Sequence, residues 1–314
     1  MQNIDVSIII VNFKTSELVF DCLRSINNFT NGIAFEVIVV DNSEDEKEFS
    51  KLLALRSSFS FSIKILKPQK NLGFGTANNL GAKESKGTYV LFLNSDTVLL
   101  NNAIKQMIDT ERRTINVGIL GANLFQGNGK PSYSYSPYKI SQRMPIKMVS
   151  IFAWAHSKIR HRNPFFNYSN HPLAVKGYIT GACMLIKKDL FFKIGPFDER
   201  IFMYSEDLLL SYRFQKAGYK LINDPAAKII HYEGGSSTKE ISDTKAGFMA
   251  DGAAIFAGEA FGLTRRFQYL KTLARSESIL AFRSKIRHKI LEYKNCMKLR
   301  KYYLKKSSIL KVVK

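Results

Sequence analysis

The sequence predicts an α/β fold with a mostly parallel central sheet flanked by helices, followed by a basic helical C-terminal extension. Three observations support this prediction. Short β-branched apolar runs alternate with helix-compatible segments over the first hundred residues, two of the runs end in an aspartate, and positive charge is concentrated at the C-terminus. Strands that alternate with helices favour a parallel sheet covered on both faces.

The chain opens with a predicted strand, a helix and a second strand. VSIIIVNF (residues 6–13) and FEVIVVDNS (35–43) are continuous apolar runs, as expected of strands buried on both faces. SELVFDCLRSI (16–26) lies between them and has the spacing of a helix that packs by one side. That apolar stripe consists of Leu18, Cys22, Leu23 and Ile26.

Two further strands are predicted before residue 100. SIKILKP (62–68) follows a polar, helix-compatible stretch, and TYVLFLNSD (88–96) is the fourth strand. GTANNLGAKESKG (75–87) lies between them and predicts a short helix, with Thr76 as its N-cap and Gly87 as its stop.

The second half of the chain begins with an irregular region and then returns to regular elements. Residues 125–175 show no periodic pattern. Beyond them the sequence predicts a strand (175–188), a short helix (189–195), a longer helix (205–218) and a strand that runs into a Gly-Ser loop (227–237).

The composition is that of a folded protein. The chain has 314 residues, of which 45% are hydrophobic, enough for one large or two smaller domains. Its three cysteines are far apart and form no CxxC pair, which favours a reducing, cytosolic compartment. We expect no signal peptide and no membrane span, because the apolar runs are shorter than the roughly 18–20 residues that a spanning helix needs.

The net charge of +21 is unevenly distributed. Residues 265–314 contain 16 Lys and Arg against 2 Asp and Glu, a net of +14, whereas the rest contains 31 against 24, a net of +7. A tail with this balance predicts an anionic partner surface, either nucleic acid or anionic lipid.

Two aspartates follow predicted strands at the edge of the sheet where ligands bind. Asp96, in LNSD, is suited to a divalent cation that bridges phosphate oxygens, although a turn or capping aspartate explains it as well. Asp41, in VVDNS, is able to accept from a base N–H or a ribose hydroxyl, or simply to end its strand in a turn.

Three other places carry side chains or backbone suited to chemistry. Gly73 and Gly75 precede a helix, so backbone amides there are able to approach a phosphate, but the GxGxxG and Walker patterns are missing. Glu206 and Asp207 follow Ser205, the predicted N-cap, so an ionised carboxylate in this first turn is a general-base candidate. A neutral His231 imidazole is able to bind metal or phosphate. Each of these features also has a purely structural explanation: a tight turn, capping electrostatics or a hydrogen-bonded histidine.

Taken together, these segments resemble family 2 glycosyltransferases of the GT-A fold, especially the rhamnosyltransferase-like branch that acts on bacterial surface polysaccharides. The resemblance covers roughly residues 5–238 in order. The matching segments are VSIIIVNFKTSELVFDCLRSI, EVIVVDNSEDE, NLGFGTANNLG, YVLFLNSDT, GACMLIKKDLFFKIGPFDERIFMYSEDLLLSYRFQKAG and HYEGGSS. It implies a catalytic domain over residues 1–262 and a basic helical tail over 263–314.

The resemblance also implies roles for single residues. Asp207, with Glu206 beside it, corresponds to the catalytic base, and Asp96 and His231 to metal ligands for Mg²⁺ or Mn²⁺. Asn94 stands where the DxD-type motif has its first acid, and Leu209 stands where the branch often has a second aspartate. The implied donor-binding residues are Val11, Asn12, Asp41, Asn71, Gly73, Asn78, Asn94, Ser95 and Asp96.

The function implied is that of an inverting glycosyltransferase. The donor is a nucleotide sugar, with dTDP-rhamnose favoured over a UDP-sugar, and the acceptor is a hydroxyl of a lipid-diphosphate-linked or growing bacterial surface polysaccharide, such as an O-antigen or capsule. We expect a cytoplasmic protein, peripheral at the inner face of the plasma membrane, with the tail on anionic lipid and MVSIFAWA (148–155) as a second contact.

Alternatives remain at this point. One is a nucleotidyltransferase, although VNFKTSE lacks the basic, Gly-rich signature of that class. Another is a nucleic-acid-binding protein, but acids at strand ends repel phosphate unless a metal intervenes, so nucleic acid is not an expected partner. The tail itself either contacts a membrane, packs on its own domain or mediates oligomerisation.

Overall fold

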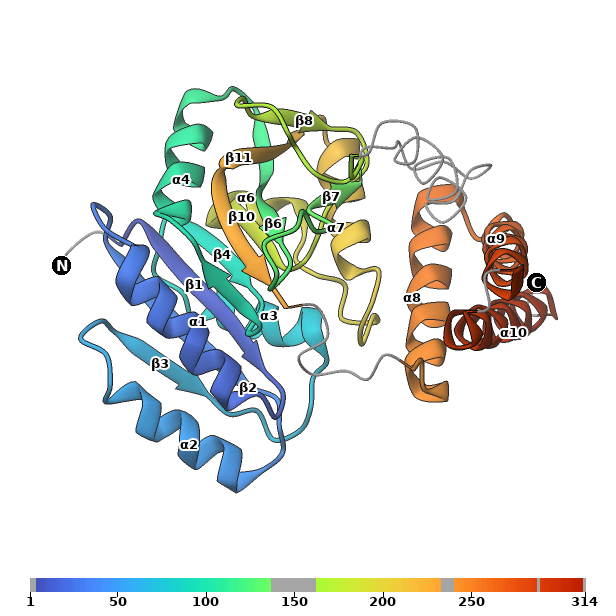
Figure 1. The fold of residues 1–314 in the computed structure, drawn as a ribbon, viewed down its shortest axis with the longest axis horizontal. Helices are drawn as coiled ribbons and strands as arrows, with labels where there is room; N and C mark the ends of the chain where they lie inside the picture. The colour runs from blue at the N-terminus through green and yellow to red at the C-terminus, as the bar shows by residue number, and fades with distance from the viewer. Residues whose placement is uncertain (1–3, 137–161, 233–239, 287–288, 313–314) are drawn as a thin grey trace.

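The computed structural model describes residues 4–136, 162–232, 240–286 and 289–312. In this part of the chain a nine-stranded sheet occupies the centre, in the order β3-β2-β1-β4-β10-β6-β11-β5, with β8 paired to β11 (Figure 1). Strands β1, β2, β3, β4, β6 and β11 run in one direction, and β5, β8 and β10 run in the other. The α/β class and the mostly parallel sheet predicted from the sequence are therefore confirmed.

The first four strands form the parallel half of the sheet. Their bounds are Val6–Asn12 for β1, Phe35–Asp41 for β2, Ile63–Leu66 for β3 and Tyr89–Leu93 for β4. Both faces of β1, β2 and β4 are buried, and alternate residues of β1 join different hydrophobic clusters: Ile8 one, and Ile9 the other. This accounts for their continuous apolar sequences. The edge strand β3 is less covered, with Lys64 exposed.

The second half of the sheet is mixed. Its strands are β5 (Thr97–Leu99), β6 (Val117–Phe125), β8 (Leu173–Val175), β10 (Cys183–Lys187) and β11 (Lys220–His231). A separate two-stranded sheet pairs β7 (Tyr135–Ser136) with β9 (Tyr178–Ile179).

Helices cover both faces of the sheet. One cluster packs side chains of α1 (Ser16–Phe29), α2 (Glu46–Arg56) and α4 (Ala103–Arg113) against the sheet. The helices on the other face are α3 (Phe74–Lys83), α6 (Lys188–Ile194) and α7 (Glu206–Lys216).

Two boundary predictions were wrong for tertiary reasons. The helix predicted over 75–87 is α3, and its N-cap is Gly73 rather than Thr76, because the N–H of Phe74 donates to the carbonyl of Phe202 at 2.9 Å. The helix also ends at Lys83, well before Gly87.

The strand predicted over 175–188 is divided into the end of β8, β9 and β10. Residues 180–182 interrupt it, and here the N–H of Gly181 donates to the side chain of Asp207 rather than to a neighbouring strand. The carbonyl of Ala182 still accepts from the N–H of Asn94, next to the last register pair of β10 and β4. The last predicted strand, 227–231, is only the end of β11, which begins at Lys220.

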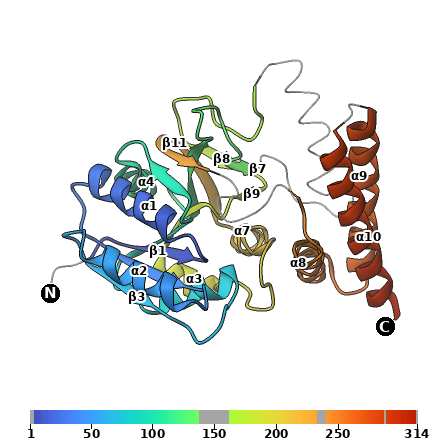
Figure 2. The same ribbon diagram turned by 60° about the horizontal axis from the view of Figure 1, so that its bottom comes forward.

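Three C-terminal helices form a bundle beside the sheet domain (Figure 2). They are α8 (Asp243–Phe261), α9 (Arg266–Ile286) and α10 (Ile290–Val312), and α9 and α10 form an antiparallel hairpin. A shared core joins the three helices to α7 and includes Leu208, Leu209, Ala250, Phe256, Tyr269, Leu270, Leu273, Leu299 and Tyr303. No helix in the described residues is long and apolar enough to cross a membrane.

This bundle changes the interpretation of two sequence features. Leu209, which departs from the family pattern, is buried in the shared core. Helix α8, which lies before the predicted boundary at residue 262, packs with both tail helices, so one side of the tail does pack on its own chain. The division into 1–262 and 263–314 stays a prediction, and MVSIFAWA (148–155) lies outside the described residues.

Candidate active site

The carboxyl ends of β1, β2 and β4 bring several predicted site residues to one edge of the sheet. Asn12 and Asp41 are register partners at the ends of β1 and β2. Asn94, Ser95 and Asp96 form the turn between β4 and β5. Ligands of open α/β sheets bind outside this edge, so the strand-end residues lie where the sequence placed a ligand site.

Asn12 connects the ends of the first two strands. Its amide nitrogen donates to Oδ1 of Asp41 at 2.9 Å and to Oγ of Ser43 at 3.0 Å. Its amide oxygen accepts from the backbone N–H and the hydroxyl of Thr15, each at 3.0 Å. Since both ends of the amide are engaged, Asn12 fixes the position of its neighbours.

Asp41 presents one oxygen that the protein leaves unused. Oδ1 accepts from Asn12 and from the backbone N–H of Ser43, whereas buried Oδ2 has no hydrogen-bond partner in the described chain. A buried acceptor of this kind costs free energy unless a ligand donates to it. The geometry suits an N–H of a base or a hydroxyl of a ribose.

The glycine-rich turn is hydrogen-bonded to Asn42, the residue that follows Asp41. Asn42 donates to the carbonyl of Gly73 at 2.9 Å, and the N–H of Gly73 donates to Oδ1 of Asn71 at 2.9 Å. Asn78 lies farther along α3, is buried, and donates to the carbonyl of Phe74 at 3.0 Å. Val11, half-buried, packs beneath this turn with the cluster around β2.

Asn94, Asp96 and His231 converge at the ends of β4 and β11. Nε2 of His231 lies 3.2 Å from Oδ1 of Asp96 and 3.3 Å from the amide nitrogen of Asn94. β11 pairs with β5 here, with His231 opposite Thr97, which explains why a residue so distant in sequence reaches this turn. Ser95 lies 3.2 Å from the hydroxyl of Thr15, linking the turn to Asn12.

These three residues suit a divalent cation. Buried Oδ1 of Asn94 has no hydrogen-bond partner among the residues that the structure describes, and a half-turn of the amide would bring this oxygen to the side of His231, where the amide nitrogen now lies. The described residues hold no cluster of three or more His, Cys, Asp or Glu. The donor set is therefore one carboxylate, one imidazole and one amide oxygen, which Mg²⁺ or Mn²⁺ is able to accept.

Asp207 lies in the first turn of α7 and is held by backbone donors. Oδ2 accepts from the N–H of Gly181 at 3.0 Å and Oδ1 from the N–H of Leu208 at 2.7 Å. Burial raises the pKa of Asp207, and these backbone hydrogen bonds oppose that rise. The residue as a whole is half-buried, at the border between the protein interior and solvent.

Glu206 is the buried member of the pair. Burial first, and then the neighbouring Asp207 charge, raise the pKa of Glu206 to about 8. Its Oε2 lacks a hydrogen-bond partner within residues 4–312 as far as they are described. The two carboxyls therefore differ: Glu206 is mostly protonated near neutral pH, and the less buried carboxylate is that of Asp207.

The turn before α7 has an unusual backbone. Tyr204 and Ser205 both have positive φ, 71° and 78°, in the left-handed region that side chains disfavour. Ser205 occupies the N-cap position as predicted, but its side chain makes no capping bond in the described structure, so its predicted capping role was wrong. In the left-handed conformation its hydroxyl does not reach the first-turn amides.

Two glycines hold this turn from opposite sides. A Cβ at Gly73 would lie 2.3 Å from the carbonyl oxygen of Phe202, and a Cβ at Gly252 of α8 would lie 2.1 Å from that of Tyr204. Both distances are far below van der Waals contact. The backbone that leads into Asp207 is therefore packed between the glycine-rich turn and the C-terminal bundle.

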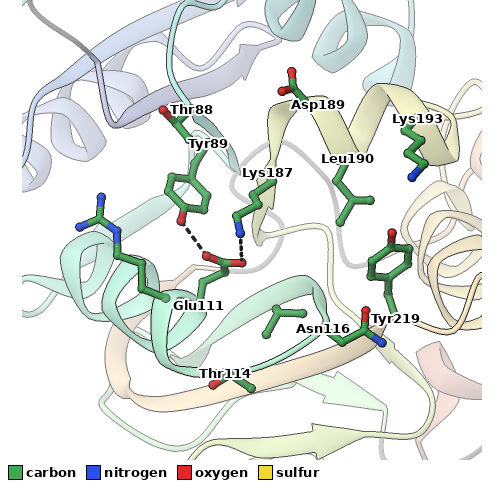
Figure 3. A pocket seen from close by; sticks show the side chains of 12 residues that line it. Thr88, Tyr89, Glu111, Thr114, Asn116, Lys187, Asp189, Leu190, Lys193 and Tyr219 are labelled. Carbon is green, nitrogen blue, oxygen red and sulfur yellow. Dashed lines mark hydrogen bonds and ion pairs between the residues drawn. The ribbon is translucent and has the colours of Figure 1, made fainter.

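A cavity of about 610 Å³ lies at the opposite edge of the sheet (Figure 3). Tyr89 begins β4, Val117 begins β6 and Lys187 ends the antiparallel β10, so these residues mark the amino ends of the parallel strands. Glu111 accepts from the hydroxyl of Tyr89 at 2.6 Å and pairs with Lys187 at 2.8 Å. None of the predicted site residues lines this cavity.

Comparison with known proteins decides the family. The sequence profile described as glycosyl transferase family 2 matches residues 7–195, more than half of the chain. The chain belongs to glycosyl transferase family 2. The match includes the strand ends with Asn12, Asp41 and Asp96, whereas Asp207 and His231 lie beyond it.

Among curated relatives, this family 2 chain is 27% identical over 192 residues to an N-acetylglucosaminyl-diphospho-decaprenol L-rhamnosyltransferase of Mycobacterium tuberculosis. The match covers 57% of the chain and 62% of the relative, so the chain spans less than two thirds of that protein's length. The rhamnosyltransferase-like character expected from the sequence is supported at this modest identity.

Solved structures confirm the GT-A fold. GalNAc-T7, solved with UDP, GalNAc and Mn²⁺, superimposes with a TM-score of 0.64 at 15% identity, covering 88% of this chain and 51% of that one. The mannosyltransferase PcManGT of Pyrobaculum calidifontis, solved with GDP-Man and Mn²⁺, gives 0.58 at 14%, covering 99% and 88%. Identities this low show the common fold alone.

Some residues at the family 2 site were missed from the sequence. Thr15, Ser43 and Gly181 make hydrogen bonds to predicted site residues. The hydroxyls of Tyr133 and Tyr178 are 3.0 Å apart. Burial raises the pKa of both, and the Asp207 charge adds to the rise. No periodic pattern in the sequence distinguishes these residues from their neighbours. Ser43 alone was indicated, because it belongs to the polar turn that follows the second predicted strand.

Proposed function

We propose that this family 2 protein is an inverting glycosyltransferase that moves a sugar from a nucleotide-sugar donor to an acceptor hydroxyl. The observation that carries the proposal is the placement of a half-buried carboxylate, Asp207, next to the loop that also holds Asn94. The adjacent residues Gly181 and Ala182 make both contacts. The same dipeptide therefore contacts both the proposed base and the proposed donor-binding turn.

In the proposed reaction the Asp207 carboxylate accepts the proton of the acceptor hydroxyl. The hydroxyl oxygen forms a bond to C1 of the donor sugar, and the bond from C1 to the diphosphate oxygen breaks with its electron pair leaving on the diphosphate. This single displacement inverts the anomeric configuration and needs no enzyme nucleophile. Asp41 Oδ2 accepts from the base or ribose of the donor.

The residues that would hold a divalent cation are Asp96 and His231, with the amide oxygen of Asn94. Bound there, Mg²⁺ or Mn²⁺ would neutralise charge on the leaving diphosphate. The presence of Mn²⁺ in the two solved structures with this fold supports this part of the proposal. Asn94 supplies a neutral ligand where the family motif has an acid, so less negative charge faces the diphosphate.

For the donor we propose a dTDP-deoxysugar, with dTDP-rhamnose first, because the mycobacterial relative is named as an L-rhamnosyltransferase. That relative's name also includes a diphospho-decaprenol acceptor, which supports a lipid-linked glycan as the acceptor class here. We propose that transfer takes place at the cytoplasmic face of the membrane, in the synthesis of a surface polysaccharide such as O-antigen or capsule.

The proposal is tested by thermal unfolding with TDP, UDP, GDP and ADP, each with and without Mn²⁺. A ligand that binds only the folded chain raises Tm in proportion to its occupancy. We expect a metal-dependent rise that is largest with TDP. A largest rise with UDP or GDP would keep the enzyme class and change the donor, and no rise with any nucleotide would contradict the proposed function.

A further inference from the structure

The α9–α10 hairpin has exposed apolar residues at its turn. Ile279 and Phe282 lie one helical turn apart near the end of α9, and Ile290 and Leu291 begin α10. Phe282 is 67% exposed and Ile290 is 70% exposed. We call these four residues the hairpin tip. Large apolar side chains gathered at one end of a hairpin indicate an interaction surface.

Many of the other apolar residues of the tail are buried within the bundle. Tyr269, Leu270, Leu273, Leu299 and Tyr303 are buried against α8. One set of apolar residues thus joins the bundle core, and the hairpin tip stays outside it. Leu263 before α9, Ile309 near the end of α10 and Met297 in the body of α10 are also exposed, but they do not gather at one turn as the tip residues do. A tail that lay along its whole length on a bilayer would need the first set for the lipid as well, and the bundle core already uses that set.

The charge around the tip is almost entirely positive. Lys285, Lys289 and Lys294 are exposed near it. Of the two acids in residues 265–314, Glu277 is buried and Glu292 pairs with Lys289. A cationic rim around apolar side chains matches the interface of an anionic bilayer, where the apolar groups enter the acyl region and the lysines meet the headgroups.

We propose that the hairpin tip docks the protein on an anionic lipid surface. The tip is a poor match for nucleic acid, because three of its four side chains are aliphatic and offer bases neither a stacking face nor a hydrogen bond. It is also a poor match for a second copy, because a two-fold contact there would face the lysines of both copies toward one another. This inference deepens the proposed function by naming the part of the chain that contacts the membrane. It rests on the proposed function for the reason why the protein would bind a membrane, and not for the binding itself.

The experiment is flotation of the full chain with phosphatidylcholine vesicles, with and without phosphatidylglycerol, at low and high NaCl. We expect binding only with phosphatidylglycerol, weakened by salt. The double variant Phe282→Ser/Ile290→Ser is expected to bind at least about tenfold more weakly, because binding strength follows the apolar area that enters the interface. Ile115→Ser is the matched control, since Ile115 is 84% exposed outside the bundle.

A second pair of variants separates charge from apolar insertion. Lys285→Glu/Lys294→Glu is expected to lose the preference for phosphatidylglycerol while keeping the Tm of the unmodified chain. The inference would be overturned by equal binding of the Phe282→Ser/Ile290→Ser variant, by the absence of vesicle binding, by tighter binding to RNA than to vesicles, or by tip-dependent dimers in sedimentation. The nucleotide thermal shift on the same preparations tests the donor site separately. A failure of the membrane-docking proposal therefore does not contradict nucleotide binding, and a failure of nucleotide binding does not contradict membrane docking.

Discussion

Asp207 accepts a hydrogen bond from the backbone N–H of Gly181 at 3.0 Å, so the proposed base is held by a loop of the sheet as well as by its own helix. The carbonyl of the next residue, Ala182, accepts from the backbone N–H of Asn94 at 3.0 Å. One dipeptide thus fixes both sides of the proposed reaction. The bond between Ala182 and Asn94 joins backbone atoms and survives side-chain substitution, whereas the bond from Gly181 ends on the Asp207 carboxylate, which is the group to be tested.

Asp207→Asn is expected to lower transfer by about 10²–10⁴-fold, because an amide keeps the shape but takes no proton. Donor binding should change little, since Asp207 is not among the proposed donor contacts. Radiolabelled sugar transfer and the nucleotide thermal shift measure the two effects on one preparation. Turnover at the unmodified rate would exclude Asp207 as the base.

Asp96→Ala is expected to weaken the effect of Mn²⁺ on nucleotide binding by about 10–100-fold, the range seen even for residues that only support metal ligands. Titration calorimetry with TDP, with and without Mn²⁺, measures this. Asp189→Ala is a suitable control because Asp189 is an exposed acid beside the cavity at the far edge of the sheet. If the Mn²⁺ dependence of nucleotide binding is unchanged in Asp96→Ala, Asp96 is not a ligand of the cation.

Glu206 should make the chain less stable as pH rises. Its pKa is raised from 4.5 in an unfolded chain to about 8 in the fold. The folded state therefore binds the extra proton, so the contribution of Glu206 to the free energy of unfolding is greatest below about pH 4.5 and falls until about pH 8. The total loss is on the order of a few kcal/mol.

Glu206→Gln removes the titrating group and should remove this part of the slope. Urea unfolding of both proteins at several values between pH 5 and pH 8.5 (a range set by the pKa given above) provides the comparison. We expect the variant to gain stability relative to the unmodified chain as the pH rises. Parallel curves would show that Glu206 does not titrate in this range.

Gly252→Ala is expected to destabilise the fold by about 1–3 kcal/mol, because the added methyl overlaps the carbonyl of Tyr204. It should also lower transfer by shifting the turn that leads into Asp207. Gly258→Ala on the same helix is the control: its methyl would lie 3.5 Å from the nearest atom of Leu263, and alanine favours the helix. Similar loss of activity in both variants would remove the argument for a special contact at position 252.

The strand ends were predictable from the sequence, and the turns between them were less so. Parallel strands end at one edge of a sheet, so the aspartates after two apolar runs indicated a common site. The start of α3 at Gly73 depends on the carbonyl of Phe202, which is distant in sequence and therefore invisible to a local capping pattern. The break at Gly181 has the same cause, since Asp207 competes for its N–H.

The tail shows a similar limit. Its charge could be counted from the sequence, and its helical character was evident. The sequence could not divide its apolar residues between core and surface, because that depends on which face meets α8. Tyr269 is buried, whereas Phe282, thirteen positions later, is exposed.

The contact between Gly252 and Tyr204 also limits how this protein can be recombined with its relatives. A chimaera joined at Gly262 would retain α8 but remove the partners of its alanine-rich face, leaving Ala250 and Phe256 open to solvent. The segment that can be exchanged as a unit therefore begins with α8 and includes α9 and α10. A segment that replaces it must place a glycine, or an equally flat surface, against Tyr204. The proposed membrane contact is then exchanged together with part of the scaffold behind α7.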